Sequence, residues 1–303
     1  MPEKQIHPVG MIFARLIWLM IALLALGLWA GGLSARYQEL LIPCSETACP
    51  PLSLSSGEID LLSQTGFSIQ GYAGIQVGLE VITVLTFVIP GILIFWRRAD
   101  DRIGFLFSLV LILVGTSAVV NGDDALLRTY PSVSFFHSLV VTLSMALIMI
   151  MFIFPDGRFV PDWTRYYTIF FLLLLAGILI GSRGDLNPYF SGGELEWVGS
   201  LFTMGTFLLG AFAQVYRFRN VSNPTERQQT KWVVLGIAAM VSGITTWILF
   251  IELFPPLPGM KRILVNLILV IIVSLFNLVF PISVMLAILR YRLWDIDIIV
   301  RRT

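Results

Sequence analysis

The chain has 303 residues, of which 57% are hydrophobic and only 13% are charged, with a mean hydropathy of +0.86. Soluble domains are about a quarter charged, so this composition indicates an integral membrane protein. A net charge of +1 gives no basic field for nucleic acid, and two cysteines with two histidines leave little for metal or thiol chemistry. We therefore expect no nucleic-acid partner, no metal and no cofactor.

Eight apolar stretches follow one another along the chain, most of them close to the roughly 20 residues that a helix needs to cross a bilayer. The predicted spans are 12–33, 72–96, 103–120, 134–154, 166–181, 197–216, 232–253 and 263–289. The sequence thus predicts an all-α integral membrane protein, with residues 1–303 forming one polytopic domain. We expect a bundle of about eight transmembrane helices that carries a short extracytoplasmic loop or helix as a lid.

The basic residues are confined largely to every second loop. The N-terminus, the loops after the second, fourth and sixth spans, and the C-terminal tail hold 15 of the 20 Lys and Arg residues. Loops rich in Lys and Arg stay in the cytoplasm, and an even number of spans also puts both termini on one side. The expected location is the bacterial inner membrane, with both termini cytoplasmic and the lipid bilayer as the immediate partner.

The longest loop, 34–71, is predicted to be extracytoplasmic, and it contains Cys44 and Cys49. Thiols tend to oxidise outside the cytoplasm, so a local disulfide that shapes this loop is expected. Free thiols or a metal site are the alternatives, and no histidine lies near enough in the sequence to support a metal.

A second feature of this loop is the spacing Ser55-Ser-Gly-Glu58, which is that of a capping box at the start of a helix. Hydrophobic residues follow it and Gly66 ends the stretch, so we expect a short helix on the outer face of the membrane. Two roles stay open for it: a packing element that covers the bundle, or a surface that senses a ligand.

Two cytoplasmic loops have distinct chemistry. Pro155 ends the fourth span and the following Asp156-Gly157 pair is typical of a turn. The loop before the seventh span carries Arg227 and Lys231, which satisfy the positive-inside rule and can bind anionic lipid headgroups.

Ionisable residues inside spans are functional candidates, because a charge in hydrocarbon is costly. Glu80 lies about a third of the way into the second span and is either a structural buttress or part of a signalling or proton-linked step. His137 lies near the outer end of the fourth span, where a structural role at the interface is the simpler interpretation. Pro90 and Pro281 are expected to kink the second and eighth spans.

Five motifs occur in a fixed order along nearly the whole chain. They are Leu79-Glu-Val81 after the cysteine-containing loop, Phe95-Trp-Arg-Arg-Ala-Asp-Asp-Arg102, Phe154-Pro-Asp-Gly-Arg-Phe159, Glu226-Arg-Gln-Gln-Thr-Lys-Trp-Val233 and Leu289-Arg-Tyr-Arg-Leu-Trp-Asp-Ile-Asp297. In this order they resemble the N-terminal multi-pass membrane region of bacterial sensor histidine kinases of the Chloroflexi-like type. The resemblance implies a two-component signalling system, a homodimer, and a cytoplasmic kinase module or response regulator as partner in cis or in trans.

The C-terminal segment 291–303 departs from that family's pattern. In the family it leads into a further membrane helix and then the kinase module, whereas here it stops at Thr303 with no glycine motif of an ATP lid. We expect it to be a cytoplasmic connector that is truncated, with either a longer kinase or a separate partner as its continuation. The connector residues named by the resemblance are Tyr291, Arg292, Trp294, Asp295 and Asp297. His7 and His137 are both misplaced for a phospho-acceptor.

Three function classes follow. The favoured one is a signal-input region that relays a stimulus through the helix bundle to a cytoplasmic output domain. A transporter or channel for a small molecule or ion is the alternative, although paired polar residues near the midplane and internal repeats are missing. A membrane enzyme is the third, and it lacks convergent catalytic groups at one depth, so no catalytic residue is assigned.

Overall fold

The computed structural model describes residues 8–45, 52–117, 122–181, 196–222, 224–253 and 259–289. Throughout these segments the regular elements are helices, and the isolated pairing of Cys44 with Ser55 is the one bridge of strand type described there. The all-α prediction is therefore confirmed for the described part of the chain.

The helices have the following bounds: α1 Pro8–Leu41, α2 Ser56–Gln64, α3 Ile69–Arg98, α4 Arg102–Ser117, α5 Gly122–Thr129, η1 Pro131–Val133, α6 Ser134–Ile148, η2 Met149–Phe152, α7 Thr164–Gly181, α9 Glu196–Asn220, α10 Pro224–Leu253 and α11 Met260–Leu289. Every predicted span falls on one or two of them. Three of these described elements lie outside the predicted spans. The capping box predicts α2, whereas no sequence feature predicts the short helices α5 and η1.

Within the described residues, four helical stretches are long and apolar enough to cross a membrane: 10–41, 69–98, 131–152 and 260–289. Two shorter apolar helices, 102–117 and 164–180, accompany them. The bundle of about eight transmembrane helices therefore stays a prediction. Apolar helices of this length indicate a membrane protein, because the hydrocarbon of a lipid bilayer is the solvent that suits so much exposed apolar surface. Leu16, Phe13 and Met20 on α1, for example, are each more than half exposed.

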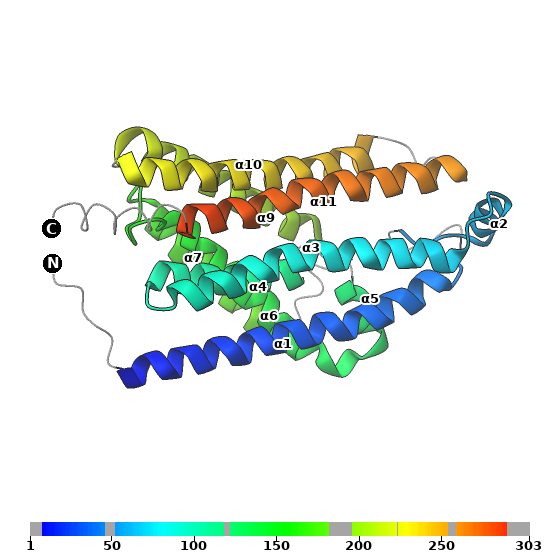
Figure 1. The fold of residues 1–303 in the computed structure, drawn as a ribbon, viewed down its shortest axis with the longest axis horizontal. Helices are drawn as coiled ribbons and strands as arrows, with labels where there is room; N and C mark the ends of the chain where they lie inside the picture. Colours follow the sequence, from blue (N-terminus) through cyan, green and yellow to red (C-terminus); the bar gives the residue numbers. More distant parts are fainter. Residues whose placement is uncertain are drawn as a thin grey trace.

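The long helices lie side by side along the long axis of the molecule; α10 and α11 are antiparallel, as are α3 and α4, whereas α3 and α11 run in the same direction (Figure 1). Helix α11 packs against both α10 and α3, and α3 packs against α4. The start of α1 and the end of α11 lie at one end, and α2 lies at the other. We call these the basic end, where Arg97, Arg98, Arg219, Arg227 and Lys231 are found, and the α2 end.

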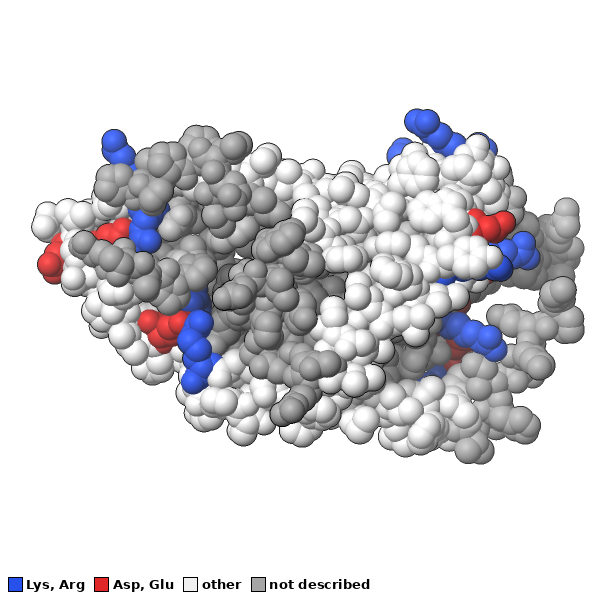
Figure 2. Space-filling model, turned by 180° about the vertical axis from the view of Figure 1, so that it is seen from behind, with Lys and Arg blue, Asp and Glu red and all other residues white. Residues whose placement is uncertain are grey.

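On the face shown in Figure 2, the charged side chains of the described residues gather towards these two ends, and the described surface between them is uncharged. Such an uncharged surface is the one that hydrocarbon requires, since charges belong at headgroup level. The long axis therefore agrees with the direction in which a bundle of this kind crosses a bilayer.

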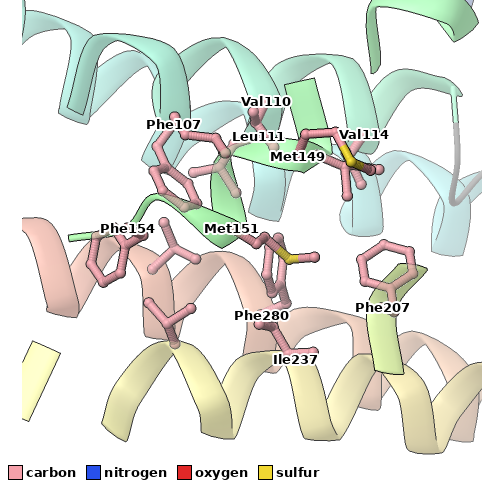
Figure 3. Packing of buried hydrophobic residues seen from close by; sticks show 14 of the residues in the cluster. Phe107, Val110, Leu111, Val114, Met149, Met151, Phe154, Phe207, Ile237 and Phe280 are labelled. Carbon is pink, nitrogen blue, oxygen red and sulfur yellow. The ribbon is translucent and has the colours of Figure 1, made fainter. Parts of the chain in front are cut away.

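The main core lies between α3, α4, α6, η2, α7, α9, α10 and α11 and consists of large apolar side chains, among them Phe107, Met151, Ile237 and Phe280 (Figure 3). Close approach of α3 and α4 depends on Gly91, where a Cβ would lie 2.9 Å from the backbone oxygen of Ser108. Helix α1 joins the bundle through Trp18, whose indole N–H donates to Ser108 Oγ at 2.9 Å and whose ring stacks on Phe95.

Several helix bounds differ from the predicted spans for physical reasons. Helix α10 begins at Pro224, eight residues before the predicted span at 232, because hydropathy detects the apolar part of a helix and misses its charged first turns. The predicted span 134–154 is α6 followed by the 3-10 turn η2, and its chain turns at the Pro155-Asp156-Gly157 sequence. Gly157 has φ +80°, a conformation that favours glycine.

Candidate functional site

The α2 end is covered by residues 52–64, which we call the lid; it comprises the loop 52–55 and helix α2. The lid is built around Glu58, the N3 residue of the predicted capping box. Its Oε2 accepts from the backbone N–H of Ser55 at 3.0 Å and from the Ser55 hydroxyl at 3.2 Å. The helix start is thereby fixed, as the sequence spacing predicts.

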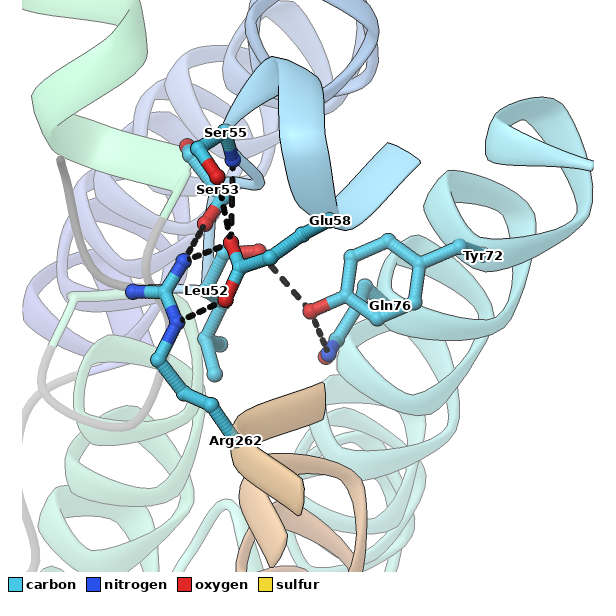
Figure 4. Close-up of polar contacts among 7 residues, drawn as sticks. All are labelled: Leu52, Ser53, Ser55, Glu58, Tyr72, Gln76 and Arg262. Carbon is cyan, nitrogen blue, oxygen red and sulfur yellow. Dashed lines mark hydrogen bonds and ion pairs between the residues drawn. The ribbon is translucent and has the colours of Figure 1, made fainter. Parts of the chain in front are cut away.

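Glu58 also binds the first turn of α11. Arg262 Nε donates to Glu58 Oε1 at 2.6 Å, while Arg262 Nη2 donates to Glu58 Oε2, so the guanidinium and carboxylate meet in a two-point contact (Figure 4). Arg262 Nη2 donates further to the backbone oxygen of Ser53 at 3.1 Å. This geometry is the strong, directional form of an ion pair, and it joins the lid to α11 across 204 positions of sequence.

Helix α3 binds the same loop through a short chain of hydrogen bonds. The hydroxyl of Tyr72 donates to the backbone oxygen of Leu52 at 2.8 Å, and Gln76 Nε2 donates to the Tyr72 oxygen at 3.2 Å (Figure 4). Tyr72 is fully buried, together with Leu40, Leu54 and Leu62. The lid is therefore held by apolar packing as well as by the ion pair.

Two opposing effects set the pKa of Glu58. Burial raises it, whereas the hydrogen bonds from Arg262 and from the Ser55 backbone, with the positive charge of Arg262, lower it by more. The net result is a pKa below the ordinary 4.5. Glu58 is consequently ionised at neutral pH, and the two-point contact with Arg262 is a true ion pair.

A polar cavity of about 40 Å³ lies directly beneath the lid. Its walls come from α1, α3, α11 and the lid loop: Arg36, Leu52, Gln76, Glu80, Thr83, Val270 and Ser274. On α3 the lining residues are spaced at i, i+4 and i+7, so they form one helix face. A volume of this size has room for roughly two to three waters, and the polar lining suits them.

A second charged group flanks the cavity. Arg36 is almost fully buried and donates to Glu39 at 3.0 Å, and Glu39 also pairs with Arg128 of α5 at 2.7 Å. Because Arg36 lines the cavity as well, this network connects α1 and α5 to the same site. The cavity thus presents a guanidinium and a carboxylate, with amide and hydroxyl groups between them.

The structure places the candidate residues from the sequence in different environments. Glu80 lines the cavity, and its Oε1 atom is buried. His137 is buried in the first turn of α6 and does not line the cavity. Cys44 is disulfide-bonded, while Cys49 lies outside the described residues, so the pairing of the two stays a prediction.

The connector residues Tyr291, Arg292, Trp294, Asp295 and Asp297 also lie outside the described residues. Their expected role at the end of α11 therefore stays a prediction.

Sequence reasoning missed Arg36 and Arg262, which it treated only as charges in the topology count. The capping box located Glu58, yet nothing in the sequence pairs it with an arginine 204 positions away. Arg36 falls within the predicted extracytoplasmic loop 34–71, whereas α1 continues to Leu41 and buries the side chain.

The basic end has its own cluster of polar contacts, which the sequence also did not predict. Arg217 of α9 is buried and donates to Asp156 and to the backbone oxygen of Arg158, both in the turn after η2. Gln214, one turn earlier, donates to the backbone oxygen of Phe154 at 3.2 Å. These bonds fix that turn against α9 and satisfy a buried charge, so their role is structural.

The chain matches no protein-family model, no curated protein and no solved structure. Within the described segments, no group of three His, Cys, Asp or Glu residues could hold a metal ion. The candidate site is therefore defined by its own geometry: a lid joined by an ion pair to the first turn of α11, above a small polar cavity.

Proposed function

We propose that this protein is the membrane-embedded signal-input region of a bacterial two-component system. In this proposal it crosses the cell membrane eight times, with the basic end and both termini in the cytoplasm. It acts as a homodimer and relays a stimulus at the α2 end to a cytoplasmic kinase module or response regulator, in cis or in trans. The ordered motifs described above support the family, and the lid geometry supports the mechanism.

The observation that carries the proposal is the two-point contact between Glu58 and Arg262. Arg262 belongs to the first turn of α11, and α11 extends to the basic end of the molecule (Figure 1). The lid at one end is therefore bound to a helix that ends at the other. A displacement of the lid would act on α11 directly, without passing through a flexible loop.

Relay also requires an element with two arrangements. The lid supplies one, since its ion pair with Arg262 is either made or broken. Pro281 inside α11 supplies a point of bending nearer the basic end, because proline removes a backbone hydrogen bond of the helix. The polar cavity beneath the lid is the proposed place where a small polar ligand or a change in hydration alters the balance between the two arrangements.

The direct test is a chimera that joins residues 1–303 to a cytoplasmic histidine kinase module of known activity. Glu58→Gln breaks the ion pair with almost no change in shape, and we expect it to change the rate of autophosphorylation in membrane vesicles. Asp60→Asn is the matched control, because Asp60 is an exposed carboxylate on the same helix α2. Equal kinase activity in the parent, Glu58→Gln and Asp60→Asn chimeras would refute the relay.

The orientation is tested separately with reporter fusions. A reporter at Ser56 should report the outside and one at Asn223 the cytoplasm, because the basic ends of the helices are retained inside. Two reporters on the same side would contradict the eight-span topology.

A transporter or channel is the second candidate, favoured by the polar cavity with Glu80, Thr83 and Ser274 among apolar helices. Transport would require these residues to form part of a path across the bilayer. Flux of protons or small cations in proteoliposomes that is lost in Glu80→Gln would favour this candidate over the sensor.

A further inference from the structure

A groove of about 840 Å³ lies beside α9 and α10 at the basic end. One lining residue comes from α9 and the others from the first half of α10: Phe218, Arg227, Gln228, Lys231, Trp232, Val234, Leu235 and Ala238. The opposite face of α10 is occupied by α11, since Gly236 approaches Phe280 and Ile237 is fully buried. The groove is therefore on the side of α10 that faces away from the core.

The lining changes character along the groove. Arg227 and Lys231 are exposed and one helical turn apart at its outermost part, and Trp232 follows. Beyond them the lining is apolar, with Leu235 half exposed. At 1.5 Å per residue, the distance from Arg227 to Ala238 along the helix is about 16 Å, which matches a phosphate group followed by the first part of an acyl chain.

The cationic part of the groove is already ordered. Arg227 Nε donates to the backbone oxygen of Ser222 at 3.1 Å, and the Ser222 hydroxyl donates to the backbone oxygen of Arg217 at 3.1 Å. A guanidinium held through Nε keeps its terminal N–H groups for an anionic oxygen, so less side-chain entropy is lost on binding. No carboxylate is found among the described residues that line the groove.

We propose that this groove is a binding site for an anionic phospholipid of the surrounding leaflet. The phosphate lies between Arg227 and Lys231, and one acyl chain follows Val234, Leu235 and Ala238. A soluble anion would leave the apolar part of the groove unused, and a zwitterionic lipid would leave the two cations without a net negative partner. The proposal depends on the protein lying in a membrane and is independent of the proposed signalling role.

The test uses the purified full chain and native mass spectrometry, with phosphatidylglycerol and phosphatidylcholine as the added lipids. Wild-type protein should retain phosphatidylglycerol in preference to phosphatidylcholine. Each cation near a phosphate changes affinity by about fivefold, so Arg227→Gln/Lys231→Gln should weaken phosphatidylglycerol binding by about 25-fold. The matched control is Arg97→Gln/Arg219→Gln, which removes two exposed cations of the same end that do not line the groove.

A second variant tests the apolar part. Ala238→Trp fills the groove at an exposed position, so it should reduce retention of both lipids while leaving the melting temperature unchanged. Equal loss of phosphatidylglycerol in the groove and control double variants would overturn the proposal, as would full retention by Ala238→Trp. A change in oligomeric mass without a change in lipid retention would also overturn it, because the groove would then hold another copy of the chain.

Discussion

Replacing Glu58 by glutamine should open the lid locally without unfolding the bundle. The glutamine keeps the shape and one carbonyl oxygen, which can accept from the Ser55 N–H and from Arg262 Nη2. Its amide nitrogen is a donor and cannot accept from Arg262 Nε, so that hydrogen bond is lost. A hydrogen bond to a charged group contributes about 1.5–3 kcal/mol, so the loss of this one bond is about 2 kcal/mol. It stays below the 3–5 kcal/mol typical of a broken buried pair because the Arg262 side chain is 25% exposed and keeps some water.

Hydrogen exchange of the α2 amides measures this loss directly, since it reports the free energy of local opening. A loss of about 2 kcal/mol corresponds to a roughly 30-fold fall in the protection of α2. Exchange in α4, which is not in contact with the lid, should stay unchanged. Asp60→Asn provides the control, because it makes the same chemical change on the exposed face of α2.

The reasoning would be refuted if α2 were as well protected in Glu58→Gln as in the wild type. Such a result would mean that the apolar contacts of Leu54 and Leu62 alone hold the lid closed. An equal fall in Asp60→Asn would refute it too, because the effect would then reflect the helix charge and not the pair with Arg262.

Three further predictions follow. Because the pKa of Glu58 is lowered in the folded protein, the ion pair stabilises the lid fully above the ordinary pKa of 4.5 and loses this effect as the pH falls through the lowered pKa. The protection of the α2 amides from hydrogen exchange, corrected for intrinsic exchange rates, should therefore fall below about pH 4.5 in the wild type. It should depend less on pH in Glu58→Gln. Arg217→Met leaves Asp156 without its buried partner and should lower the free energy of unfolding by about 3 kcal/mol. The melting temperature in detergent should then fall by about 5 °C, whereas Arg219→Met, at an exposed position, should change it little. A membrane-impermeant maleimide should label Cys44 and Cys49 only after reduction; full labelling without a reductant would contradict the disulfide.

The helices themselves could be predicted from the sequence because hydropathy and helix-start signals act locally. The capping box at Ser55 and Glu58 predicted α2, and the structure confirms that helix. Helices α1 and α10 extend beyond the predicted spans for one reason: both helices continue through polar residues, which a hydropathy criterion leaves out of a span.

The site could be predicted only in part, since its partners are far apart in the sequence. Glu80 was selected because a carboxylate among apolar residues is unusual, and the structure places it in a polar cavity. The contacts of Arg262 with Glu58 and of Arg217 with Asp156 depend on how α11 and α9 pack in three dimensions. The order of charged residues along one sequence does not identify which of them form such ion pairs.

The central claim is that the lid at one end of the molecule controls the position of α11 at the other. It is tested by pulsed electron paramagnetic resonance on the full chain, with spin labels on non-canonical amino acids at Gly10 and Leu289. These positions lie near the start of α1 and at the end of α11, both at the basic end (Figure 1). The account predicts that Glu58→Gln shifts the distance distribution between them while Asp60→Asn leaves it unchanged. An unchanged distribution in Glu58→Gln, in protein whose α2 has lost its protection from exchange, would contradict the account.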